Sequence, residues 1–63
     1  MTQKELLYVE DAIGHEKSII TICEETLKNL QDESLKSFIE SEIQKHTSMK
    51  EKLMNQLEVK SNE

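Results

Sequence analysis

Three polar residues interrupt the apolar pattern of this chain, and they are the positions where its sequence can support chemistry. Glu16 lies on the apolar side of the first half, and Glu42 and His46 lie one helical turn apart on the apolar side of the second half. A buried carboxylate is costly unless it is paired or bound to a metal. Carboxylates and imidazole are common ligands of iron, manganese and zinc, so these three residues form the candidate metal site.

Polar pairing is the competing interpretation, and the residue spacing favours it. Metal-binding helical bundles use Glu-x-x-His, whereas this chain has Glu42-x-x-x-His46. A hairpin folded about Asp32 is expected to place Glu16 near Met49, which leaves Glu42 about two turns away. We therefore expect the three polar residues to form hydrogen bonds or ion pairs that fix the helix register. Neighbouring lysines are the other available partners: Lys17, Lys45 and Lys50.

No motif in the chain indicates catalysis, and we expect no enzyme activity. The sequence contains no glycine-rich phosphate loop, nucleophile elbow or zinc-protease motif. The single cysteine, Cys23, follows the apolar pattern and is expected to behave as a small buried hydrophobe. His15, beside Glu16, is expected to be a solvated histidine at the rim of the apolar side.

Two apolar ladders carry these polar residues and predict two long helices. Apolar residues recur at alternating steps of three and four on both sides of a short polar break over residues 31–33. We expect helices over about residues 3–30 and 33–58, and a frayed tail over 59–63. Thr2 and Glu5 fit a capping box, and Asp32 fits an N-cap. The sequence thus predicts an all-α fold, an antiparallel two-helix hairpin that forms one domain over residues 1–63.

Apolar residues beside each ladder make the apolar side wider than one hairpin requires. A chain of 63 residues with one cysteine buries little surface and has no internal disulfide to stabilise it. We therefore expect a homodimer that forms a four-helix bundle. The expected interface is the ladder itself: Leu6, Val9, Ile13, Ile20, Leu27, Leu35, Ile39, Met49 and Leu53. The alternative is a regulatory hairpin that docks the same residues on the helices of another protein.

Charge and composition exclude several kinds of partner. The formal net charge of −5 disfavours binding to nucleic acid or to an anionic lipid surface. The longest uninterrupted apolar run covers only residues 6–9, so we expect no signal peptide and no membrane span. The expected location is the cytoplasm.

Three segments resemble the coat-F type of bacterial spore coat protein. They are residues 10–17 (EDAIGHEK), residues 31–36 (QDESLK) and the stretch from Glu42 to His46, within a resemblance that covers about residues 9–57. The aromatic-rich ending of that family is absent, so the chain resembles a short, divergent member. The resemblance implies a ferritin-like helical fold and a structural role in the spore coat. It also implies other coat proteins as partners beside a second copy.

Overall fold

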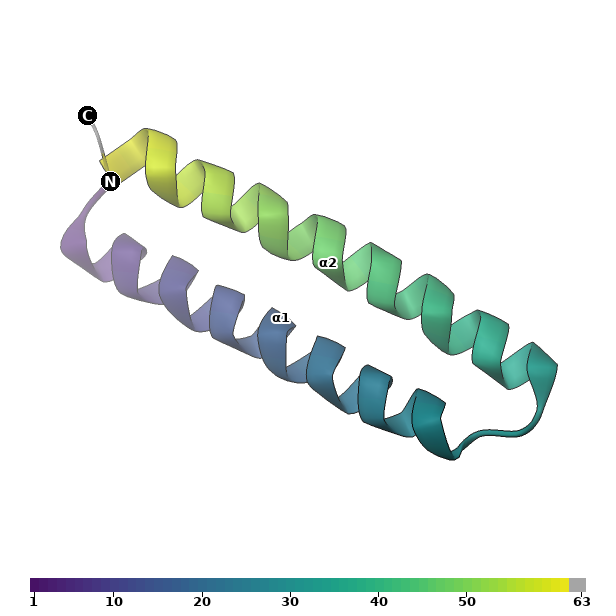
Figure 1. Cartoon of the computed structure of the whole chain (residues 1–63). Helices are drawn as coiled ribbons and strands as arrows, with labels where there is room; N and C mark the ends of the chain where they lie inside the picture. The colour runs from purple at the N-terminus through teal and green to yellow at the C-terminus, as the bar shows by residue number, and fades with distance from the viewer. Residues whose placement is uncertain (62–63) are drawn as a thin grey trace.

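Two antiparallel helices make up nearly all of residues 1–61, which a computed structural model describes, with side chains over residues 1–59. Helix α1 (Gln3–Asn29) and helix α2 (Glu33–Ser61) run side by side and are joined by a short turn (Figure 1). The described residues contain no strand. The predicted all-α hairpin is therefore confirmed, and α1 agrees with its expected bounds to within one residue.

The start of α1 is fixed by its first residues. The backbone N–H of Glu5 donates to the Thr2 hydroxyl at 3.1 Å, and the backbone N–H of Thr2 donates to the Glu5 carboxylate at 2.8 Å. These bonds satisfy two amides that have no partner inside the helix. The predicted capping box is confirmed.

Asp32 begins α2 in the predicted way, because its carboxylate accepts from the backbone N–H of Leu35 at 3.0 Å. Helix α2 continues to Ser61, three residues beyond the expected end. The expected tail over residues 59–63 is thus helical as far as Ser61, and residues 62–63 lie outside the described part. No glycine or proline follows the turn, so no backbone signal stops α2 earlier.

A single hairpin buries few of its side chains. The radius of gyration is 14.6 Å, whereas a compact domain of this length has about 11 Å. Among the described residues, only Ile13 and Glu16 are buried, and each keeps a small exposed fraction. Most of the expected interface residues lie half-buried along the hairpin: Leu6, Val9, Ile20, Leu27, Ile39 and Leu53. Leu35 and Met49 remain exposed, so the ladder mainly forms the contact between the two helices of one chain.

Gly14 lies in the exposed middle of α1. A Cβ atom added there would have no neighbour within 4 Å in the single chain, so packing against α2 does not require the glycine. Neither helix, over the described residues, combines the length and the apolar character that crossing a membrane requires.

Candidate functional site

Glu16, Glu42 and His46 come together at the middle of the hairpin and form what we call the polar trio. His46 Nδ1 lies 2.5 Å from Glu16 Oε2 across the two helices. His46 Nε2 lies 3.5 Å from Glu42 Oε2 on the same helix. The side chains of Glu16 and His46 are 11% and 19% exposed, and that of Glu42 is 29% exposed. The imidazole ring therefore stands between two carboxylates in a largely desolvated setting.

Helix geometry explains how each member reaches the site. Glu42 and His46 are four residues apart on α2, so their side chains leave the same side of the helix one turn apart. The Glu16 side chain projects from the side of α1 that packs against α2, which also carries Ile13 and Ile20. The 3.6-residue period thus places all three side chains between the helices.

The register of the hairpin differs from the expected one. Glu16 meets His46 rather than Met49, so the prediction that Glu42 lies two turns from Glu16 is wrong. Both Glu16 and His46 are fifteen residues from Gln31 in the sequence. The chain therefore reverses direction about Gln31, at the middle of the turn, and not about Asp32, which already caps α2. Spacing within each helix could not reveal this contact, because the turn geometry decides it.

The arrangement gives each polar side chain of the site a hydrogen-bond or ion-pair partner. A protonated imidazole donates from both nitrogens, so it can serve one carboxylate on each side. In the described part of the chain, no buried side-chain nitrogen or oxygen is left without a hydrogen-bond partner. The predicted polar pairing therefore occurs among the three residues themselves, across the helices and within α2.

The polar trio has the geometry of a hydrogen-bonded or ion-paired cluster. The two imidazole nitrogens point to different carboxylates, so one ion can contact all three residues only if the His46 ring turns. Over residues 1–61, no group of three or more histidine, cysteine or acidic side chains is arranged to hold a metal ion. Binding of iron, manganese or zinc at this site stays a prediction.

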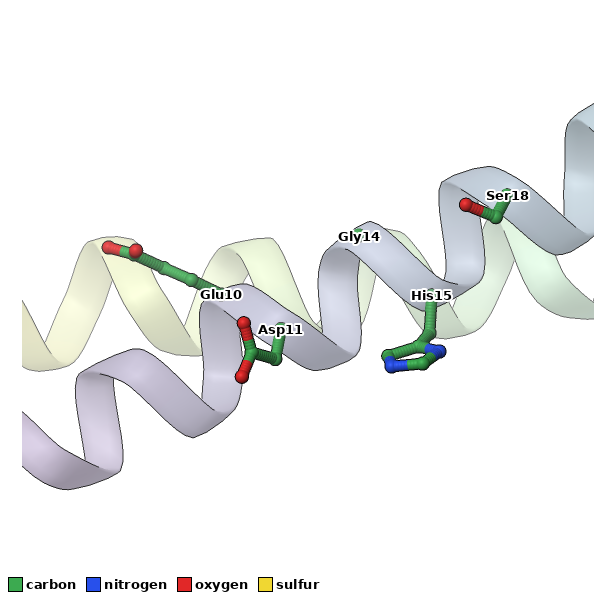
Figure 2. Close-up of a pocket in the computed structure, with 5 residues that line it drawn as sticks. All are labelled: Glu10, Asp11, Gly14, His15 and Ser18. Atoms are coloured by element: carbon green, nitrogen blue, oxygen red, sulfur yellow. The ribbon is translucent and has the colours of Figure 1, made fainter.

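A shallow depression on the outer side of α1 surrounds Gly14 and is lined by four polar residues: Glu10, Asp11, His15 and Ser18. In Figure 2, Asp11 and His15 project on one side of α1, whereas Glu10 and Ser18 point elsewhere. The side chains diverge from one another, so they do not form a ligand set. His15 is exposed, as predicted for a rim histidine, and Cys23 is a half-buried free thiol.

Comparisons with protein-family models, with curated proteins and with solved structures found no match to this chain. The resemblance to the coat-F type therefore rests on the three sequence segments alone.

Proposed function

We propose that this protein is a structural protein that works by helical self-association, in which two hairpins pack into a four-helix bundle. The observation that supports this proposal is the uneven distribution of apolar side chains over the hairpin. Large apolar residues are exposed on the single chain, and most of them share one face.

The exposed apolar residues are large and numerous for so short a chain. Nine large apolar residues of the described part are each more than two-fifths exposed. Five of these lie on one side of the hairpin, and we call them the apolar face: Tyr8, Ile22, Leu35, Phe38 and Met49. Large exposed apolar patches mark interaction sites in soluble proteins.

Helix geometry places these five residues on the same side of the hairpin. Each of them comes one residue before a half-buried residue, as Tyr8 precedes Val9 and Phe38 precedes Ile39. A step of one residue turns about 100° around a right-handed helix. Because α1 and α2 are antiparallel, the residue that precedes an inward-facing residue lies toward the same face of the hairpin in both helices. The positions one step forward are mostly polar or small, and include Glu10, Gly14, Lys17, Thr21 and Glu40.

The accessible surface of the hairpin is large enough to be partly covered by a second copy of the chain. The single chain has an accessible surface of 4982 Å², whereas a compact monomer of 7.4 kDa has about 4,200 Å². The excess is about 800 Å², which equals the area that each partner buries in an interface of standard size. A second copy presents the same apolar face and can therefore cover it symmetrically.

Native mass spectrometry of the untagged protein tests this proposal, supported by sedimentation over a range of concentrations. We expect a mass twice that of the 7.4 kDa chain. Tyr8→Glu and Phe38→Glu should each shift the protein toward monomer, because each introduces a charge into the apolar face. Leu7→Glu is the matched control, since Leu7 is 54% exposed and lies two residues before Val9, away from this face. A monomeric wild-type protein at high micromolar concentration would overturn the proposal.

The resemblance to the coat-F type supports the spore coat as the setting, with other coat proteins as further partners. Immunolocalisation in a spore-forming host tests this part separately. Signal confined to the cytoplasm of the mother cell after coat assembly would contradict it, without affecting self-association.

Metal binding by the dimer is the second candidate function, and the convergence of the polar trio favours it. Two copies would bring together four glutamates and two histidines. Stoichiometric iron, manganese or zinc in the native mass spectrum would support this function. Added metal should then also raise the midpoint of thermal unfolding, because a ligand of the folded state stabilises it.

A further inference from the structure

We propose that the two hairpins pair with both turns at the same end of the bundle, so that α1 of each copy lies on α2 of the other. In this arrangement the partner's Lys45 reaches the polar trio and completes its charge pairing. The inference rests on the proposed self-association and specifies its geometry.

Two symmetric arrangements can join the apolar faces. A two-fold axis parallel to the helices puts α1 on the partner's α2 and keeps both turns at one end. A two-fold axis across the helices puts α1 on the partner's α1 and places the turns at opposite ends. Both arrangements bury the same residues, so the apolar area does not distinguish them.

The charges near the middle of the hairpin do distinguish them. Glu16 is the central residue of α1 (Gln3–Asn29), and His46 is next to the centre of α2 (Glu33–Ser61). Lys45 precedes His46 by one residue and is exposed, so it lies toward the apolar face at the same height as the polar trio.

The same-end arrangement places Glu16 opposite the partner's Lys45 and His46. The opposite-end arrangement, when the helices overlap fully, puts Glu16 at the height of the partner's Glu16. It also sets Lys45, which lies toward the apolar face, against the partner's Lys45. Like charges brought together in a desolvated interface are strongly unfavourable, whereas opposite charges favour the contact. Charge complementarity therefore selects the same-end arrangement.

The Glu42 carboxylate can accept the ammonium group of the partner's Lys45 in addition to His46. Its carboxylate is 29% exposed, and its 3.5 Å separation from His46 is long for a charged hydrogen bond. The partner's ammonium group can thus approach Glu42 without displacing His46 from Glu16. The completed cluster would hold the carboxylates of Glu16 and Glu42 between the His46 imidazole and the partner's ammonium group.

Distance measurement between spin labels tests the arrangement directly. Cys23→Ala removes the native thiol, and Gln31→Cys then accepts a nitroxide at the exposed turn. The same-end arrangement predicts a label separation on the order of 20 Å, about two interhelical distances. The opposite-end arrangement predicts a separation close to the 47 Å length of the hairpin, and this result would overturn the inference.

A label at Ser18→Cys in the same background is the control, because Ser18 lies near the middle of the hairpin and is exposed. It should report a short separation in either arrangement. Dipolar coupling at residue 18 together with a long separation at residue 31 would overturn the inference and leave self-association intact. Absence of coupling at both positions would overturn the proposed function as well.

Substitution of Lys45 gives a second test, because the two arrangements predict opposite changes in the dimer dissociation constant. In the same-end dimer, Lys45→Met removes an attractive contact and should raise the dimer dissociation constant about tenfold. In the opposite-end dimer, it would remove a repulsion and lower the constant. A lowered or unchanged constant would therefore contradict the inference.

Discussion

Glu16 of α1 and His46 of α2 lie equally far from Gln31 along the chain, and their 2.5 Å contact sets the register of the hairpin. A shift of either helix by one turn, about 5.4 Å, would separate the two groups and leave the Glu16 carboxylate without its partner. Apolar side chains along the ladder tolerate such a shift far better, because one aliphatic contact can replace another. The polar pair therefore contributes specificity in a fold whose apolar contacts are repetitive.

The first prediction concerns this pair. His46→Leu should lower the free energy of unfolding by about 2 kcal/mol, because it leaves the Glu16 carboxylate unpaired between the helices. The double variant Glu16→Leu/His46→Leu should recover most of that loss, since no unpaired carboxylate then remains between the helices. Urea denaturation followed by circular dichroism, at one fixed protein concentration, measures both changes. A double variant that is less stable than His46→Leu would contradict the explanation.

The second prediction concerns the start of α2. Asp32→Ala should lower the free energy of unfolding by about 1 kcal/mol, because the Leu35 amide loses the carboxylate that accepts its hydrogen bond at 3.0 Å. Gln31→Ala at the neighbouring exposed position is the control and should change stability little. Equal effects of the two substitutions would show that the cap does not stabilise the helix.

The third prediction concerns Gly14. Gly14→Ala should raise the free energy of unfolding by about 0.5–1 kcal/mol, because alanine loses less backbone freedom in a helix and its Cβ meets no atom within 4 Å. Thermal unfolding measures the gain, and Ser18→Ala, one turn further along the exposed side, should give a smaller one. Destabilisation by Gly14→Ala would reveal a contact at this position in the assembled protein.

The fourth prediction concerns the capping box and pH. The hydrogen bond from the Thr2 backbone amide, helped by the Thr2 hydroxyl, lowers the pKa of Glu5 below its usual value. A carboxylate whose pKa is lowered by folding stabilises the folded state above its unfolded pKa. The stabilisation is lost as the pH falls through the lowered folded value.

An NMR titration of the Glu5 carboxyl carbon measures this effect. It should show a midpoint below that of a free glutamate, and Glu5→Gln should weaken the acid dependence of helicity near the N-terminus. A midpoint at or above the ordinary value would indicate that the capping box does not form in solution.

Much of the fold follows from short-range features of the sequence. The alternating steps of three and four define both helices, and the Thr2–Glu5 box and the Asp32 cap mark where each one begins. These features depend on neighbours within one helical turn, so they can be predicted without knowing the tertiary structure. The end of α2 was predicted less well, because no glycine or proline follows the turn to stop the helix.

The sequence by itself determined that Glu16, Glu42 and His46 lie on the inner sides of two helices, since residue type and helical period decide that placement. Only the tertiary structure decided that all three meet at one site. Their contact depends on the register across the turn, where a difference of three residues, from Met49 to His46, moves a side chain by about one helical turn. Register is a property of the assembled pair of helices, so neither half of the sequence contains it alone.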